Sequence, residues 1–187
     1  MCRQRQNSLT MLRNMRRPPI KIFVYRCKQW DETSSDELVP GDVISLTSSK
    51  GRGRRTAGNR KSDSNVAVEE LVVPCDALLL EGSCVVNEAM LTGESVPQMK
   101  ETPNGQENVD VVVDLGNEGS AAAWKRNIVY SGTTLMLHTT SSGQSSSIPE
   151  APDKGCLAIV LRTSFGTTQG KICIAHARIL HINKLTN

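Results

Sequence analysis

Short runs of strand-forming residues, separated by turn formers, recur along this chain of 187 residues and constrain its fold more than any other feature. β-Branched and aliphatic residues dominate the runs, whereas Gly, Pro, Asn and Ser fill the gaps between them. The runs lie at 20–25, 77–80, 84–86, 109–113, 127–130, 133–137 and 155–162, and the segment 38–46 is a Pro-Gly turn followed by a strand. Many short strands with turns between them predict a mainly β fold, a sandwich or a jelly roll with small helices.

Two hairpins are predicted from these runs. The segments 127–130 and 133–137 flank Ser131-Gly132, which is a turn sequence. Trp30 lies where a partner of the 20–25 strand would run back. Because aromatic residues make up only 3% of the chain, the core has to be built from Val, Ile, Leu and Met.

Helices are expected at the two ends of the chain. Residues 1–17 are basic and carry one narrow apolar stripe, which predicts a short amphipathic helix that Pro18-Pro19 ends. A second helix is predicted from Thr167 onward.

Two stretches without apolar periodicity are predicted to be loose loops. Residues 47–69 are rich in Ser, Gly and Arg, and residues 139–152 are rich in Ser. The basic segment 50–61 raises the alternative of RNA or anionic-lipid contact, but it lacks the interleaved aromatic residues that stack on bases. A solvated loop is the favoured interpretation.

Charge, cysteine use and hydropathy argue against several protein classes. A net charge of +3 is too small to indicate a nucleic-acid-binding protein. The six cysteines show no C-x-x-C pair, so reduced thiols are expected rather than zinc or disulfides. The three histidines, His138, His176 and His181, are given no role. The longest apolar run, 156–161, is far shorter than the roughly 20 residues of a membrane-spanning helix.

One motif carries a candidate chemistry. Residues 87–97 include Thr92-Gly93-Glu94-Ser95 and end in Pro97. Alone, these residues are typical of a surface turn, because Gly and Ser are common turn formers and Glu is usually solvated. Three further blocks accompany the motif in a fixed order, two before it, at 37–42 and 73–76, and one after it, at 156–171. This sequence context favours a functional loop.

With these blocks, the chain resembles the P-type ATPases. It is similar to their fifth class, the endoplasmic reticulum branch, because the motif continues into Gln98-Met99-Lys100-Glu101. The resemblance spans residues 3–171 apart from the two loose loops, and it implies an actuator domain with a distorted jelly-roll or β-sandwich fold. The implied divisions are an N-terminal helical linker at 1–18, the actuator domain at 19–166 and a C-terminal helical linker or truncated tail at 167–187.

The resemblance also implies a chemistry for the motif. These pumps phosphorylate one of their own aspartates and then hydrolyse the acyl phosphate, which needs an in-line water and a base to take its proton. Glu94 is the candidate base, with Gly93 allowing close approach to the phosphate and with Thr92 and Ser95 offering hydroxyls that position the loop or the water. Asn87 stands where the family usually has Asp, which leaves the detailed geometry of the loop open.

Other parts of the pump pattern do not occur in the sequence. The phosphorylated Asp-Lys-Thr-Gly-Thr motif is missing, and Asp153-Lys154-Gly155-Cys156 is interpreted as a polar turn before a strand. The isolated chain is therefore expected not to hydrolyse ATP. Because the resemblance lapses after Lys171 and Met1 falls within the domain, a truncated or mis-assembled gene product is also expected.

The resemblance implies a parent protein with further parts. The expected parent is an ATP-driven, Mg²⁺-dependent translocase of the endoplasmic reticulum membrane, with this domain facing the cytosol. The expected partners are the phosphorylation and membrane domains of that parent, and no cofactor is assigned to this chain itself. The alternative is a stand-alone β module that binds a partner and does no chemistry.

Overall fold

A computed structural model describes residues 18–48, 71–103, 124–140 and 148–183, with side chains as far as residue 175. The described strands form two antiparallel β-sheets. The predicted mainly β fold is confirmed. Residues 1–17, which include the predicted N-terminal helix, and the predicted strand 109–113 lie outside the described residues.

The larger sheet contains six strands in the order β2-β1-β3-β10-β5-β8. These strands are β1 (Lys21–Arg26), β2 (Gln29–Ser34), β3 (Val43–Leu46), β5 (Asp76–Glu81), β8 (Ile128–Val129) and β10 (Cys156–Arg162). The predicted pairing of the first strand with Trp30 is confirmed, because β1 and β2 form a hairpin in which Tyr25 pairs with Trp30. A short 3-10 helix, η1 (Ser35–Glu37), follows β2.

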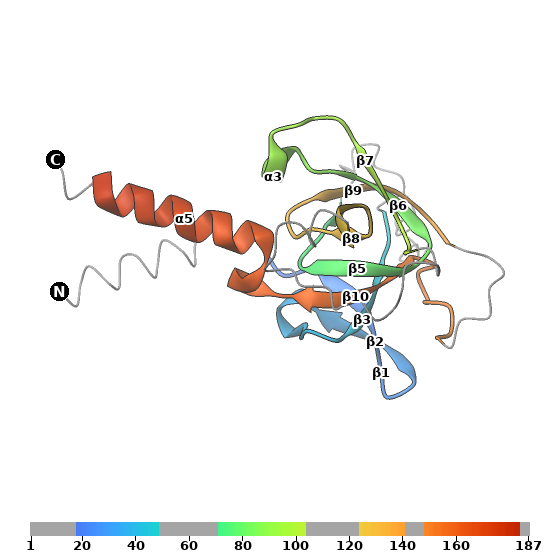
Figure 1. The fold of residues 1–187 in the computed structure, drawn as a ribbon. Coiled ribbons are helices and arrows are strands. Elements are labelled where there is room, and N and C mark those ends of the chain that lie inside the picture. The colour runs from blue at the N-terminus through green and yellow to red at the C-terminus, as the bar shows by residue number, and fades with distance from the viewer. Residues whose placement is uncertain (1–17, 49–70, 104–123, 141–147, 184–187) are drawn as a thin grey trace, which may run out of the picture.

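The smaller sheet contains four strands in the order β4-β9-β6-β7. They are β4 (Leu71–Val72), β6 (Ser83–Asn87), β7 (Gln98–Glu101) and β9 (Thr134–Thr139). The two sheets lie face to face, with β5 and β10 of one below β6 and β9 of the other in Figure 1. A short helix, α3 (Ala89–Thr92), interrupts the connection between β6 and β7.

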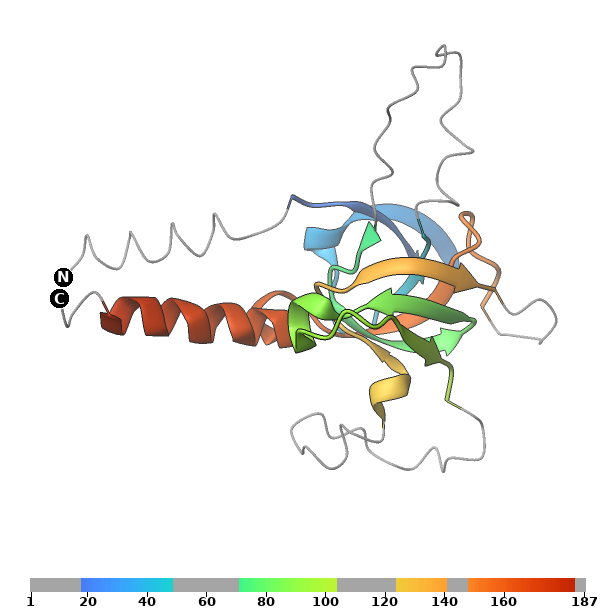
Figure 2. The same ribbon diagram turned by 90° about the horizontal axis from the view of Figure 1, so that it is seen from above.

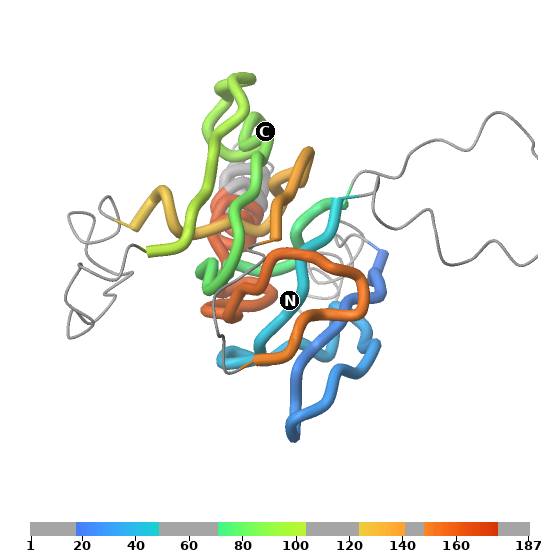
Figure 3. Tube along the Cα trace, turned by 90° about the vertical axis from the view of Figure 1, so that its right-hand side faces the viewer, coloured from blue at the N-terminus to red at the C-terminus, as the bar shows by residue number. Residues whose placement is uncertain are grey.

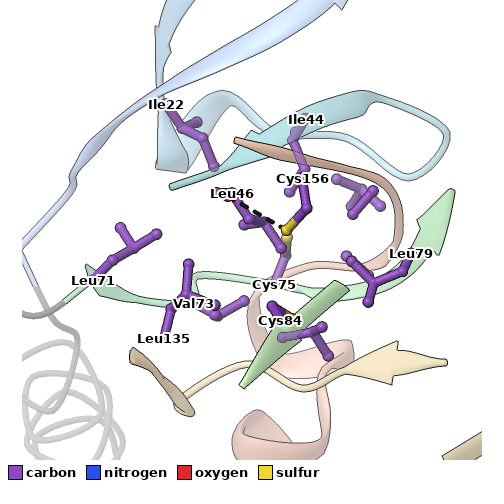
Figure 4. Packing of buried hydrophobic residues seen from close by; sticks show 14 of the residues in the cluster. Ile22, Ile44, Leu46, Leu71, Val73, Cys75, Leu79, Cys84, Leu135 and Cys156 are labelled. Atoms are coloured by element: carbon purple, nitrogen blue, oxygen red, sulfur yellow. Dashed lines mark hydrogen bonds between the residues drawn. The ribbon is translucent and has the colours of Figure 1, made fainter. Parts of the chain in front are cut away.

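One hydrophobic core fills the space between the sheets. The larger sheet contributes Val24, Ile44 and Leu79, which are fully buried, and the smaller sheet contributes Val86 and Leu135. Aliphatic side chains therefore replace aromatic ones, as the composition requires. Three cysteines lie among them, Cys75, Cys84 and Cys156, and Figure 4 shows the Cys156 thiol directed at the carbonyl oxygen of Leu46, 3.4 Å away.

The described cysteines, Cys27, Cys75, Cys84, Cys156 and Cys173, are free thiols. Burial raises the pKa of the Cys75 thiol to about 12, because a thiolate would lose its hydration in this apolar surrounding. Cys2 lies outside the described residues.

The predicted hairpin around Ser131-Gly132 is wrong. β8 pairs with β5 in the larger sheet, whereas β9 pairs with β4 and β6 in the smaller one. The chain crosses between the sheets here, and two backbone hydrogen bonds of 2.9 Å hold the crossing, from Gly132 N to Val73 O and from Val73 N to Thr133 O. The local pattern of two strands and a turn carries no information about these remote partners.

Some end residues of the two predicted loops belong to the packed structure, which the sequence pattern does not indicate. Thr47 and Ser48 are buried, and the backbone nitrogen of Ser48 donates to His138 Nδ1 at 3.0 Å. At the second loop, Ala151 is buried and Asp153 accepts hydrogen bonds from Ser45 Oγ and Thr47 Oγ1. The remainder of both loops, at 49–69 and 141–147, lies outside the described residues.

The predicted C-terminal helix is confirmed as α5 (Thr168–Asn183). It follows the 3-10 helix η3 (Ser164–Gly166) and extends away from the two sheets in Figures 1 and 2. In the described part of the chain, no helix combines the length and the apolar character needed to cross a membrane.

Candidate functional site

The candidate motif lies in the connection between two paired strands. β6 and β7 are antiparallel, with Val86 opposite Gln98, and α3 and residues 93–97 join them. This connection protrudes from the sheets at the top of Figure 3. The hairpin therefore holds both ends of the loop in a fixed register.

All four residues of the motif are exposed. Thr92 ends α3, and Gly93, Glu94 and Ser95 follow it on the surface. Gly93 has a φ of 78°, in the left-handed region, and its backbone N–H donates to Ala89 O at 2.9 Å. This is the usual way in which glycine ends a helix. The chain reverses here because only glycine adopts that conformation without strain.

The Thr92 hydroxyl joins the helix to the residue after the glycine. Its Oγ1 donates to Glu88 O at 3.3 Å and accepts a hydrogen bond from the backbone nitrogen of Glu94 at 3.2 Å. Thr92 therefore fixes the backbone at Glu94, a role that fits the prediction that its hydroxyl positions the loop.

The residue at position 87 supports the start of the helix. Asn87 Oδ1 accepts a hydrogen bond from the backbone nitrogen of Ala89 at 2.9 Å. An amide oxygen satisfies this otherwise unpaired N–H as a carboxylate would, without the negative charge. Asn at this position is thus compatible with the fold of the loop.

A buried ion pair lies at the base of the loop. Glu88 and Lys100 have side chains only 3% and 2% exposed, and Glu88 Oε1 lies 2.6 Å from Lys100 Nζ. The same ammonium donates to the carbonyl oxygen of Lys125 at 2.8 Å, in the 3-10 helix η2 (Trp124–Arg126), and lies 5.2 Å from the centre of the Tyr130 ring. Buried charges persist in proteins when they are paired in this way.

Sequence reasoning did not identify this pair. Charged side chains are expected in solvent. The sequence pattern places Glu88 in the motif and Lys100 in the extension that follows it, without indicating that either is buried. A signal was nevertheless present in the strand register: Lys100 pairs with Cys84, which is buried, so the two side chains share the inner face of the sheet. Burial raises the pKa of the neighbouring Tyr130, and the carboxylate of Glu88 raises it further.

The described residues of the loop carry side chains that are suited to proton transfer. Glu94 offers a carboxylate, and Thr92 and Ser95 offer hydroxyls, all on the surface. A carboxylate in this position can accept a proton from a water molecule, but the group that the water attacks has to be presented from outside the loop. The exposed loop therefore fits a role in which its side chains act on a group carried by another domain or molecule.

The sequence matches the family model for the P-type ATPase actuator domain over residues 65–175. This stretch includes the loop, both of its strands and the beginning of α5.

Individual relatives match a larger part of the chain. The "Endoplasmic reticulum transmembrane helix translocase spfA" of Aspergillus fumigatus is 37% identical over 180 residues, covering 90% of this chain and 12% of its own length. The "Endoplasmic reticulum transmembrane helix translocase" of Schizosaccharomyces pombe is 40% identical over 169 residues, with coverages of 90% and 12%. The "Probable manganese-transporting ATPase PDR2" of Arabidopsis thaliana is 38% identical over 172 residues, with coverages of 92% and 13%. The chain thus spans about one eighth of the length of these relatives.

Proposed function

The chain belongs to the P-type ATPase family as an actuator domain, and from this premise we propose that its 92–95 loop promotes hydrolysis of an aspartyl phosphate carried by another domain. Glu94 is the general base, which takes a proton from the attacking water. Thr92 and Ser95 orient the loop and the water, and Gly93 gives the bend. The family match favours this function over the alternative of a stand-alone β interaction module.

The exposed position of Glu94 carries the proposal. A base acting on another domain's phosphate must lie on the surface and must also be held in place, because a misplacement of about 1 Å can cost roughly 100-fold in rate. Glu94 meets the first condition through its exposure and the second through the hydrogen bond from its backbone nitrogen to Thr92 Oγ1.

We assign ATP and Mg²⁺ to other parts of the parent protein. In the described part of the chain, no three His, Cys, Asp or Glu side chains come together as metal ligands would. The partners of this domain are the phosphorylation domain, which presents the phosphate, and the membrane domain, to which the segments 1–18 and 167–187 connect the actuator domain at 19–166.

The parent is proposed to be a translocase of the endoplasmic reticulum membrane, with this domain on the cytosolic side. Two of the relatives are named as endoplasmic reticulum transmembrane helix translocases, whereas the plant relative is named as a probable manganese-transporting ATPase. Relatives of nearly equal identity carry names with different cargoes, so the choice of cargo is assigned to parts of the pump outside this domain.

The test requires a complete pump. The test pump is the S. pombe relative in which this chain replaces the aligned segment. It is phosphorylated with radiolabelled ATP and chased with unlabelled ATP, so that the decay of the phosphoenzyme reports hydrolysis. Glu94→Gln is expected to slow this decay by about 10²–10⁴-fold, which is the usual contribution of a general base.

The matched control is Glu101→Gln. Glu101 is also an exposed glutamate, at the end of the strand that follows the loop. Its replacement is expected to leave the decay rate unchanged. Equal decay in the unmodified and the Glu94→Gln pumps would rule out Glu94 as the base, and a test pump whose phosphoenzyme never turns over would contradict the assignment of the domain.

A further inference from the structure

We propose that the buried Glu88–Lys100 pair is a positioning device that holds the backbone of Glu94 in its hydrolytic arrangement. This inference rests on the proposed function of Glu94 and adds two residues to the machinery of the same reaction. Neither residue touches the phosphate, so both act through the loop.

A continuous series of contacts leads from the buried ammonium to the candidate base. Lys100 Nζ lies 2.6 Å from the Glu88 carboxylate, and the carbonyl oxygen of Glu88 accepts a hydrogen bond from the Thr92 hydroxyl at 3.3 Å. That hydroxyl in turn accepts the backbone N–H of Glu94 at 3.2 Å. Three contacts therefore connect the core to the backbone of the catalytic residue.

Glu88 is the point at which the loop is held. Its carbonyl oxygen also accepts the backbone N–H groups of Leu91 at 2.8 Å and of Thr92 at 3.0 Å. The whole turn of α3 is thus built on one residue, and a shift of Glu88 would carry Thr92 and the following residues with it.

Lys100 is itself fixed from three sides. Its ammonium contacts the Glu88 carboxylate, the carbonyl oxygen of Lys125 and the face of the Tyr130 ring. These groups come from separate segments of the chain. Through the pair, the position of the loop is fixed relative to η2 and to the residue after β8, as well as relative to its own hairpin.

Stability alone is a weak explanation for this pair. Replacing a buried ion pair with apolar residues of similar volume is often neutral or stabilising, because desolvation offsets the attraction between the charges. A pair of charges with short contacts instead selects one arrangement of the surrounding backbone. That property matters for this loop, because its proposed role is to hold the carboxylate of Glu94 in one position.

The experiment separates positioning from folding by removing one charge or both. Lys100→Met keeps an unbranched side chain, one heavy atom shorter, and leaves Glu88 as an unpaired buried charge. The double variant Glu88→Gln/Lys100→Met leaves no buried charge at this site, so its melting temperature is expected to recover toward that of the unmodified chain. In the test pump, phosphoenzyme decay is expected to remain roughly 10- to 100-fold slower in both variants, with the rate of phosphorylation unchanged.

The control is an ion pair far from the loop. Arg26→Met breaks the contact with Asp42 in the larger sheet, which destabilises the chain without touching the connection between β6 and β7. Its phosphoenzyme is expected to decay at the unmodified rate. A double variant that regains full hydrolysis together with its melting temperature would show that the pair is structural only, and the proposal would fall.

A readout that does not depend on the pump uses amide exchange in the 187-residue chain. The N–H groups of Thr92 and Gly93 are bonded within the turn, and in the double variant they are expected to exchange at least about tenfold faster, while that of Ile44 in the core is unchanged. Unchanged exchange at Thr92 and Gly93 would overturn the positioning role. Normal hydrolysis in Glu94→Gln would instead overturn the proposed function, so the two failures are distinguishable.

Discussion

The carboxylate of Asp76 holds the first residue of helix α5: its Oδ2 accepts the backbone N–H of Thr168 at 2.8 Å and the Thr168 hydroxyl at 3.1 Å. The other oxygen, Oδ1, accepts the backbone N–H of Ser131 at 2.8 Å. One buried side chain at the start of β5 therefore joins the helix to the crossing between the two sheets.

Replacing this carboxylate is expected to destabilise the chain. Asp76→Ala leaves the buried N–H of Ser131 and the part-buried N–H of Thr168 without partners, and each lost partner costs about 1–3 kcal/mol. The total loss in the free energy of unfolding is expected to be roughly 2–5 kcal/mol. Urea denaturation measures it, with Asp31→Ala, at an exposed position of β2, as the control with an effect of about 0.5 kcal/mol or less. Equal midpoints for both variants would contradict the proposed role of Asp76.

The pair Arg26 and Asp42 predicts an acid-side loss of stability. Arg26 donates to both carboxylate oxygens of Asp42, at 2.9 and 2.6 Å, and these hydrogen bonds are the main cause of an Asp42 pKa below its ordinary 3.8. Because the folded-state pKa is the lower one, the contribution is present above pH 3.8 and is lost as the pH falls through the folded value. The Arg26 side chain is 38% exposed, so the expected contribution is about 1 kcal/mol.

The measurement compares the pH dependence of unfolding in two forms of the chain. Asp42→Asn is expected to lower stability at neutral pH and to flatten the decline below pH 3.8, because the titrating group is gone. An unchanged decline in Asp42→Asn would assign the acid sensitivity to another carboxylate.

Two glycines with similar backbone conformations are expected to respond differently to substitution. Gly82 has a φ of 87°, and an added Cβ would clash with the carbonyl oxygen of Thr139 and lie 2.9 Å from Cys156 Cβ. Gly41 has a φ of 96°, with nothing within 4 Å of an added Cβ. Both alanine variants carry the left-handed strain of about 1–2 kcal/mol, and Gly82→Ala is expected to lose roughly 1–3 kcal/mol more through overpacking. Thermal unfolding compares them, and equal losses would show that the backbone yields to the extra carbon.

Local structure was predictable where the sequence pattern is itself local. The runs of β-branched residues indicated β1 and β10 to within about a residue and placed β3 within 38–46, since side chains that alternate or run together report burial on a pleated surface. The partners of β8 and β9 were not predictable, because the crossing at Gly132 depends on a contact with Val73 that is remote in sequence. Pairing between strands is decided by the whole core.

The candidate site also has a part that the sequence predicts and a part that only the structure reveals. Thr92, Gly93, Glu94 and Ser95 were predictable as a candidate loop, because the proposed chemistry lies in consecutive residues with a recognisable context. The buried ion pair between Glu88 and Lys100 was not predictable, because a lysine is ordinarily solvated. Only the strand register, in which Lys100 lies opposite Cys84, reveals that Lys100 faces inward. Residues that act directly are more visible in a sequence than residues that hold them.

The last prediction separates two reasons for a glycine at position 93. The sequence suggests that Gly93 is needed because any Cβ would obstruct a phosphate, whereas the structure adds that a φ of 78° requires glycine in the turn and leaves open space around an added Cβ. Asn tolerates the left-handed conformation better than Ala, so Gly93→Asn is expected to unfold at a higher temperature than Gly93→Ala. In the test pump, phosphoenzyme decay in Gly93→Asn is expected to stay as slow as in Gly93→Ala if the phosphate approaches this residue closely. Faster decay in Gly93→Asn would instead assign the glycine to the turn conformation alone, because the asparagine side chain is the larger of the two.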